Sequence, residues 1–455
     1  MGHPFQVQRD HHCRAHDLTS HGFPFRYYTV DAHAHAAFAI QSAGLMKRIL
    51  MVAYHFPPLR GSSGIQRTLK FVKYLPEFGW EPIVLTAHPR AYEQTGEDQL
   101  LDIPPGVRVC RAFALDTARH LSIGKRYPGV LARPDRWKLW WLGAVPAGLR
   151  VARQFAPHIL WSTYPIATAH AVGSTLQRMT KLPWVADFRD PMAQEGYPED
   201  PAQWKSFERI EKRTVAAAKY CVFTTNGAAD LYRGRYPNRS AAMTVIENGY
   251  DEELFAAIER PSRATKTGPC VLLHSGIVYP SERDPTHLLA ALRSLQVSGR
   301  LSAKEMVIRF RAPVHGELIR NLAAKFGVAG MVEIAEPLPY REALREMVEV
   351  DGLLVMQAAN CNEQIPAKLY EYLRAGRPIL GLADPAGDTA KALRSCGVSS
   401  IAALEDEVAI ARSLAQFLGE LESGRASFPD AEAVRRASRR ERTAELARLL
   451  DLAAA

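Results

Sequence analysis

Short apolar segments of strand length recur along this chain, and stretches with helical periodicity separate them. A strand that is apolar along its whole length needs cover on both faces, and the intervening helices can provide it. This alternation therefore predicts α/β architecture, with doubly wound parallel sheets that carry helices on both faces. The apolar segments are residues 48–54, 81–87, 158–163, 184–188, 220–225, 243–249, 270–276, 306–312, 331–336, 351–357 and 378–384.

A polar stretch at residues 259–269, with the sequence ERPSRATKTGP, interrupts the alternation before it restarts. A chain of 455 residues is long enough for two or three domains. We therefore predict a first α/β domain at residues 46–258 and a second at residues 259–428, followed by a basic amphipathic helix at residues 429–455.

The beginning of the chain follows a different pattern. Residues 1–45 show neither helical nor strand periodicity, whereas a strand-like segment starts directly after Met46. We expect residues 1–45 to be a disordered extension, or to reflect a start codon that was assigned too early. The irregular spacing of their histidines argues against a metal site.

Charge and cysteine content narrow the class of protein. The formal net charge of +9 favours anionic partners such as phosphorylated substrates or acidic lipids, although ordinary solubility also explains it. No basic stripe with a recognition motif is present, so we expect no nucleic-acid binding. The six cysteines form no CxxC pair, which is typical of a reducing compartment. No apolar run approaches the roughly 20 residues of a membrane span, and we expect a cytoplasmic protein.

Two loops of the first half carry candidate binding residues. Gly61 and Gly64 stand just before a predicted helix, where backbone N–H groups suit a phosphate or a sugar, although a plain glycine turn has the same pattern. Asp187, Arg189 and Asp190 follow the end of a predicted strand. They indicate either a functional loop or an ordinary Asp–Arg ion pair with Asp190 capping a turn.

A third loop of the first half follows the segment at residues 158–163. Tyr164 and His170 lie there, and we keep Tyr164 as a candidate. The histidine falls at helical spacing, which is more typical of a capping or packing side chain.

The second half places a glycine and a cation after a predicted strand. Ser275 and Gly276 end the segment at residues 270–276, and Arg283 follows. A cation close to a glycine turn suits a diphosphate. Taken alone, this signal is weak.

The most specific stretch is NEQIPAKLYEYLRAGRPILG, which begins at residue 362. Glu363 and Ile365 lie in a predicted loop, Pro366 fits the first turn of a short helix, and Lys368 and Glu371 lie on that helix. A carboxylate can accept hydrogen bonds from both hydroxyls of a vicinal diol. Two carboxylates beside amide and ammonium donors therefore predict a nucleotide-sugar site, with one diol on the sugar and one on the ribose.

Several segments together resemble a known enzyme family. The chain from Met46 is similar to retaining glycosyltransferases of the GT-B fold, family 4-like (group 1), which have two Rossmann-like domains facing across a cleft. The resemblance covers about nine-tenths of the chain, and the spacing of the two glutamates is its most specific element. The matching segments are ILMVAYHFPPLRGSSGIQRTLKFVKYLPEFGWEPIVLT, VIENGYD, LLHSGIVYPSERDP and EQIPAKLYEYLRAGRPILG.

The resemblance implies roles for the donor residues. Glu363 would face the hydroxyls of the donor sugar, and Glu371 would face the ribose. Such enzymes need no bound metal or other cofactor, because cationic side chains and amides hold the diphosphate. Many relatives have an arginine where this chain has Ile277, so one cation is missing, and Lys368 is expected to compensate alongside Arg283.

The acceptor side is less defined by the resemblance. Some relatives carry a histidine in the first-domain loop where this chain has Tyr164 and Pro165, so we take Asp190 as the candidate that orients the acceptor hydroxyl. The final helix of such proteins often packs back on the first domain, and we expect the same here.

The expected activity is transfer of a sugar, with retention of configuration, from a nucleotide sugar to a glycan or a lipid-linked acceptor in cell-surface polysaccharide or glycolipid synthesis. Residues 124–155 combine Trp137, Trp140 and Trp141 with basic residues. This composition indicates either peripheral contact with an acidic membrane surface or a helix with its tryptophans in the core. Two other functions stay open, a nucleotide-sugar 2-epimerase of the same fold and a non-catalytic subunit that has kept the fold. The basic residues are Lys125, Arg126, Arg133, Arg136 and Lys138.

Overall fold

The computed structural model describes residues 27–28, 46–61, 64–97, 99–124, 126–259 and 268–455. The expectation of a disordered extension at residues 1–45 lies outside the described residues, apart from the two-residue strand β1 at Tyr27–Tyr28. The statements that follow concern the described part of the chain.

The first sheet has eight strands in the order β1-β4-β3-β2-β5-β6-β7-β8. The strand β2 runs parallel to β3 and β5, β3 to β4, β5 to β6 and β7 to β8, whereas β1 is antiparallel to β4. β4 was not among the predicted segments, because RVCRA alternates arginines with apolar residues. The strands are β2 (Lys47–Val52), β3 (Trp80–Ala87), β4 (Arg108–Ala112), β5 (Ile159–Thr163), β6 (Trp184–Arg189), β7 (Tyr220–Phe223) and β8 (Met243–Val245).

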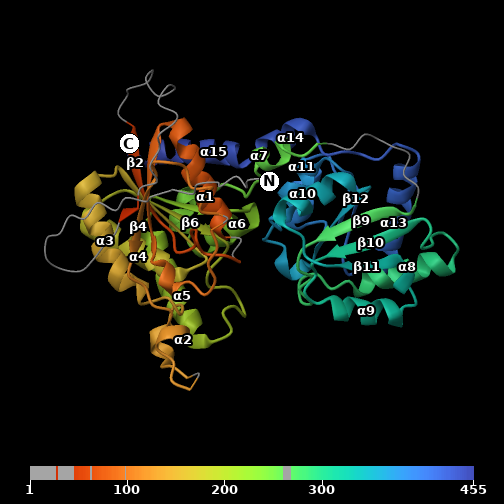
Figure 1. The fold of residues 1–455 in the computed structure, drawn as a ribbon, viewed down its shortest axis with the longest axis horizontal. Helices are drawn as coiled ribbons and strands as arrows, with labels where there is room; N and C mark the ends of the chain where they lie inside the picture. Colours follow the sequence, from red (N-terminus) through yellow and green to blue (C-terminus); the bar gives the residue numbers. More distant parts are fainter. Residues whose placement is uncertain (1–26, 29–45, 62–63, 98, 125, 260–267) are drawn as a thin grey trace, which may run out of the picture. The chain divides into compact units, whose positions relative to one another are not determined.

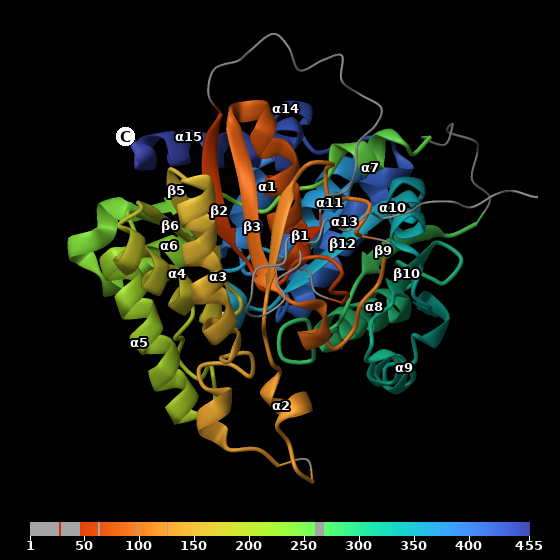
Figure 2. The same ribbon diagram turned by 60° about the vertical axis from the view of Figure 1, so that its left-hand side comes forward.

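Helices connect these strands, and Figure 2 shows α3, α4 and α5 beside one another next to the sheet. The helix predicted after the first glycine turn ends earlier than its apolar pattern, because Pro76 cannot continue the α-helical hydrogen bonding. A 3-10 turn follows and closes at Gly79, whose φ of 80° suits glycine. The helices are α1 (Gly64–Tyr74), α2 (Thr117–His120), α3 (Trp140–Phe155), α4 (Ala167–Thr180), α5 (Pro201–Ala217), α6 (Asn226–Arg235) and α7 (Glu252–Ala256).

The second sheet has six parallel strands in the order β11-β10-β9-β12-β13-β14. Its strands are β9 (Cys270–Ser275), β10 (Met306–Arg311), β11 (Val332–Ala335), β12 (Gly352–Gln357), β13 (Ile379–Ala383) and β14 (Ile401–Ala402). Its helices are α8 (Thr286–Val297), α9 (Gly316–Lys325), α10 (Tyr340–Glu349), α11 (Lys368–Ala375), α12 (Asp388–Ser395) and α13 (Glu407–Glu422).

The strands β9, β12 and β13 of the second sheet are largely buried on both faces, as their apolar sequences predicted. Successive residues of one strand enter different cores: Leu272 packs with α8, α9 and α13, whereas Leu273 packs with α10, α11 and α14 (Ala431–Arg436). Figure 1 shows these helices around the strands β9, β10 and β12. The predicted α/β fold of two parallel sheets with interleaved helices is therefore confirmed.

Contacts divide the chain into two compact units. The first unit comprises residues 1–187, 192–220 and 447–455, and the second comprises residues 188–191 and 221–446. The last helix, α15 (Arg439–Ala454), contributes its first residues to the second unit and its last residues to the first. The domain boundary at residue 259 and the role of the closing helix stay predictions.

Candidate active site

The candidate donor residues gather at the carboxyl edge of the second sheet. β9 ends at Ser275 and β12 ends at Gln357, and the loops that follow these neighbouring strands lead to Arg283 and to Glu363. Ligands of parallel sheets bind at this edge, because the loops there carry polar groups that the strands position. Strands of the second unit therefore bring together residues that are about 90 positions apart in the chain.

Glu371 lies in the first turn of α11 and is 9% exposed. Its Oε1 accepts a hydrogen bond of 2.7 Å from the hydroxyl of Tyr340, and its Oε2 accepts one of 2.9 Å from Nζ of Lys368. A largely buried carboxylate requires such partners, because its desolvation is otherwise unfavourable. The lysine contact joins positions i and i+3 of one helix and was accessible to sequence reasoning. Sequence reasoning offered no indication of the contact between Tyr340 and Glu371.

The backbone N–H groups of the glycine turn after β9 donate hydrogen bonds to other groups of the protein. The N–H of Ser275 donates to the hydroxyl of Tyr372 over 2.6 Å, and the N–H of Gly276 donates to the carbonyl of Arg311 over 2.9 Å. The guanidinium of Arg283 folds back and donates through Nη1 to the carbonyl of Ile277 over 3.0 Å. The turn is therefore held firmly, and Arg283 is the cationic side chain that lies against it.

Glu363 is exposed and lies in the loop between β12 and α11. The helix begins at Lys368, so the expectation that Pro366 lies in its first turn is wrong, and Pro366 precedes the helix. Both Ile365 and Pro366 are half-buried. The loop is held to the turn after β13 by a side-chain hydrogen bond of 2.5 Å from Asn362 to Asp384.

Sequence reasoning missed His274, which lies one residue before Ser275 and is 7% exposed. Its Nδ1 is 3.0 Å from the carbonyl of Leu354, so this nitrogen is the donor. The pKa of His274 is lowered from 6.5 to about 4, mainly by burial, and the charges of Arg283 and Lys368 act in the same direction. A polar residue inside the apolar run CVLLHSG was the signal that could have identified it.

In the first unit, the helix after the glycine turn is tied to the end of β6. Gly61 has a φ of 78° and Gly64 opens α1, although residues 62–63 between them are outside the described part. Arg67 on this helix forms two hydrogen bonds with Asp187, of 3.0 Å and 2.9 Å. The arginine partner of Asp187 is thus on a distant helix, and the sequence offered no signal for it.

The residues after Asp187 form a bent segment. Arg189 has a φ of 63°, and its carbonyl accepts hydrogen bonds from both the amide and the hydroxyl of Thr224. The amide of Asp190 donates to the carbonyl of Phe188 over 2.7 Å, and the aspartate is half-buried. The backbone therefore turns tightly just before Pro191.

The loop after β5 lies largely inside the protein. Tyr164 is 4% exposed and packs edge-to-face on Phe207, with ring centroids 6.1 Å apart. His170 is fully buried and is 2.8 Å from the hydroxyl of Ser162. Burial lowers the pKa of this histidine to about 3, so it is neutral at physiological pH. The packing interpretation of His170 fits this environment.

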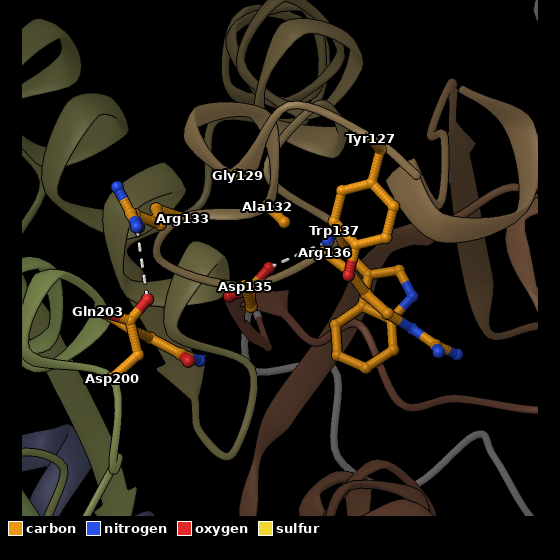
Figure 3. A pocket seen from close by; sticks show the side chains of 9 residues that line it. All are labelled: Tyr127, Gly129, Ala132, Arg133, Asp135, Arg136, Trp137, Asp200 and Gln203. Atoms are coloured by element: carbon orange, nitrogen blue, oxygen red, sulfur yellow. Dashed lines mark hydrogen bonds and ion pairs between the residues drawn. The ribbon is translucent and has the colours of Figure 1, made fainter. Parts of the chain in front are cut away.

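Two cavities of the first unit meet at Arg136 and Trp137. One, of about 310 Å³, is bordered by Tyr54 and Arg60 near the end of β2. The other, of about 340 Å³, is shown in Figure 3, where Tyr127 faces Trp137 and Arg136 extends past the indole ring. The sequence singled out these two residues for membrane contact rather than for a cavity.

Ion pairs hold Arg136 at this junction. Its Nη2 is 2.6 Å from Glu93, its Nε is 3.1 Å from the buried Asp116, and its guanidinium lies 4.8 Å from the ring centroid of Trp137. Asp135, the residue before Arg136, is also buried, and burial raises its pKa. It holds Thr168 through the amide and the hydroxyl, each at 2.8 Å. The cavity walls are therefore aromatic and polar, with their charges largely paired.

The tryptophans of the expected membrane segment divide between core and surface. Trp140 is fully buried, and Trp141 is 36% exposed and donates through Nε1 to Thr175. The strongly exposed apolar side chains nearby are instead Ile123, Val130 and Leu142, at 88%, 61% and 56%. Lys125 lies outside the described residues. No helix in the described ranges has the length and apolar character needed to cross a membrane.

The absence of metal stays a prediction. Within the described residues, no three His, Cys, Asp or Glu side chains come together in a group that could hold a metal ion.

Comparison with known proteins matches part of the chain to a family model and identifies the fold. Residues 63–249 match the family of the glycosyl transferase 4-like domain. The chain is similar in structure to sucrose-phosphate synthase from Thermosynechococcus elongatus, with a TM-score of 0.56, 14% identity and coverage of 90% of this chain and 96% of that one. It is also similar to HepE of Anabaena in complex with UDP, with a TM-score of 0.60, 14% identity and coverage of 89% and 100%.

A further structure, described as a UDP-N-acetylglucosamine 2-epimerase from Listeria monocytogenes, is less similar, with a TM-score of 0.50, 14% identity and coverage of 86% and 94%. No curated protein sequence matches the chain. These comparisons confirm the predicted GT-B fold.

Proposed function

We propose that this chain, a glycosyltransferase of the GT-B type with a glycosyl transferase 4-like domain at residues 63–249, transfers a sugar from a nucleotide sugar to a glycan or lipid-linked acceptor with retention of configuration. The observation that carries the proposal is the arrangement of Glu363, Lys368 and Glu371 at the carboxyl edge of the second sheet. Solved structures of the same fold contain UDP or UDP-glucose, which supports a nucleotide sugar as the donor.

The donor would be held by complementary groups. The carboxylate of Glu371 accepts hydrogen bonds from the ribose diol, and exposed Glu363 accepts them from the hydroxyls of the sugar. Lys368 and Arg283 stabilise the negative charge that develops on the departing diphosphate. The chain then needs no metal for this step, because two cations and helix amides neutralise the leaving group.

Retention requires that the acceptor hydroxyl enters on the face that the diphosphate leaves. The departing phosphate oxygen can take the proton of the acceptor, so the protein needs no strong base. We assign to Asp190 the task of orienting the acceptor hydroxyl, because it follows the end of β6 and the bent backbone at Arg189 presents it.

The two cavities around Arg136 and Trp137 are the best candidate for binding the acceptor. An aromatic ring beside paired polar groups suits a sugar ring, whose faces are apolar and whose edges carry hydroxyls. Exposed Ile123 and Val130 lie in the neighbouring segment together with Arg126, and this composition suits peripheral contact with acidic lipid at the inner face of the cytoplasmic membrane.

The donor half of the proposal is tested by thermal unfolding in the presence of UDP, GDP, ADP and their sugar conjugates. A ligand that binds only the folded state at 100 times its Kd adds about 2.7 kcal/mol, so the right nucleotide raises the Tm measurably. A flat response to every nucleotide contradicts the proposed donor site.

The reaction class is tested by NMR of the products. A glycosyltransferase forms a new glycosidic bond to an added acceptor, and retention gives the product the same anomeric configuration as the donor. A product with inverted configuration contradicts retention but leaves the proposed sugar transfer intact. Epimerised free sugar, formed without any acceptor, instead indicates the 2-epimerase reaction.

A further inference from the structure

Tyr340 contacts the carboxylate that the proposed function assigns to the ribose. It is the first residue of α10, 31 positions before Glu371, and its hydroxyl donates to Oε1 over 2.7 Å. Lys368 donates to the other oxygen over 2.9 Å, and its Nζ lies 5.5 Å from the centroid of the Tyr340 ring. The three side chains therefore form a closed cluster, which we call the Tyr340 clamp.

The direction of the tyrosine hydrogen bond follows from its surroundings. Desolvation raises the pKa of the Tyr340 hydroxyl although 43% of the residue is exposed, and the adjacent charge of Glu371 acts in the same direction. The phenol therefore keeps its proton at any pH at which the protein works. It can only donate to an ionised carboxylate, so both oxygens of Glu371 have a permanent donor.

Two donors do not saturate this carboxylate. Each carboxylate oxygen has two lone pairs, so four hydrogen bonds are possible and the clamp uses two. One acceptor position is left on each oxygen, which matches the two hydroxyls of a vicinal diol. Lys368 has three N–H donors and uses one of them on Glu371, so two are left for phosphate oxygens.

We propose that Tyr340 is a positioning residue of the donor site, which fixes the carboxylate of Glu371 in the orientation that accepts both ribose hydroxyls. This inference rests on the proposed donor function. Tyr340 itself does not touch the reacting atoms. When the Tyr340 hydroxyl is removed, Glu371 keeps only Lys368 as a partner and its carboxylate can rotate. Binding of the nucleotide must then order the carboxylate again.

The expected effect is specific to the ribose. Tyr340→Phe should weaken the binding of a ribonucleoside diphosphate by about 2- to 12-fold, the range that corresponds to ordering one flexible side chain on binding. Binding of the 2′,3′-dideoxy nucleotide should not change, because this nucleotide has no ribose hydroxyls that could donate hydrogen bonds to Glu371. In steady-state assays the KM for the donor should rise while kcat stays the same.

The experiment is isothermal titration calorimetry of the full chain with UDP, GDP or ADP, whichever binds most tightly, and with its 2′,3′-dideoxy analogue. Tyr197→Phe serves as the control, because Tyr197 is an exposed tyrosine of the first unit and loses the same hydroxyl. Circular dichroism of each variant verifies that the fold is kept. Tyr340 is 43% exposed, so removal of its hydroxyl leaves no cavity in the core.

Four results would overturn the inference. If Tyr340→Phe binds the ribonucleotide as tightly as the wild type does, the hydroxyl does not position Glu371. If the variant binds it more tightly than the wild type, the hydroxyl competes with the ribose. Equal weakening of both ligands would assign Tyr340 to the base or the diphosphate instead. If the wild-type chain binds no nucleoside diphosphate at all, the proposed donor function fails, and the Tyr340 clamp fails with it.

Discussion

The buried ion pair between Arg67 and Asp187 offers the sharpest test of how the first unit is held together. The arginine is 3% exposed and the aspartate is fully buried. Two hydrogen bonds of 3.0 Å and 2.9 Å join them, and Thr163 donates a third of 2.9 Å to the carboxylate. The pair connects α1, which follows the glycine turn, to the end of β6, which precedes Asp190.

The perturbation is Arg67→Met, which keeps the length of the side chain and removes its charge. Asp187 then stays buried without its counter-charge, and loss of one partner of such a pair costs about 3–5 kcal/mol. Thr163→Val removes a single hydrogen bond to the same charged group and should cost about 1.5–3 kcal/mol. The double variant Arg67→Met with Asp187→Leu removes both charges, and it should be close to the wild type in stability.

The assay can observe the first unit alone. All seven tryptophans of the chain lie between Trp80 and Trp204, within the residues of that unit. Urea unfolding followed by tryptophan fluorescence therefore reports its stability. With an m-value of about 2 kcal/mol per molar urea, the single variant should lower the midpoint by about 1.5–2.5 M.

Two outcomes would refute this reasoning. A midpoint shift for Arg67→Met well below that of Thr163→Val would mean that the charge is solvated in the native protein. A double variant as unstable as the single variant would mean that packing of the arginine, not charge compensation, holds α1 against β6.

Three further predictions concern the site, the closing helix and pH. Glu371→Gln should weaken nucleoside diphosphate binding by about 1.5–3 kcal/mol in calorimetry, whereas Glu363→Gln should lower turnover and leave that binding intact; equal losses of binding would contradict the separate roles. A chain ending at Phe428 should keep both α/β cores by circular dichroism but lose turnover more than nucleotide affinity, because α15 contributes residues to both units; full activity would show that the helix is dispensable. The buried His170 has its pKa lowered from 6.5 to about 3, so the unfolded chain binds more protons between these values and stability is lost as the pH falls through this window. Tryptophan fluorescence should show that His170→Asn loses less stability than the wild type between pH 6.5 and pH 4, and parallel losses would contradict the assignment.

The periodicity of the sequence was sufficient to predict the layered α/β fold, because burial of a parallel sheet on both faces leaves its strands apolar along their length. The strand β4 was not predicted, because Arg108 and Arg111 interrupt its apolar residues. Arg108 pairs with Glu81, and Arg111 donates to the carbonyl of Pro57, so both arginines find partners that a local pattern does not contain.

The sequence also determined which residues lie together at the carboxyl edge of the second sheet. Ser275, Glu363 and Glu371 follow the ends of neighbouring strands, and parallel strands present their carboxyl ends at the same edge. The contact between Lys368 and Glu371 was readable as well, since it spans a single helical turn.

Only the tertiary structure decided the partners that come from distant elements. Arg67 reaches Asp187 across 120 positions, Tyr340 reaches Glu371 across 31, and the tryptophans of one segment separate into buried Trp140 and cavity-lining Trp137. Periodicity assigns a side chain to a face of its own helix or strand, but it carries no information about which other element covers that face. That choice follows from the packing of whole elements and the satisfaction of buried polar groups, which are properties of the folded chain.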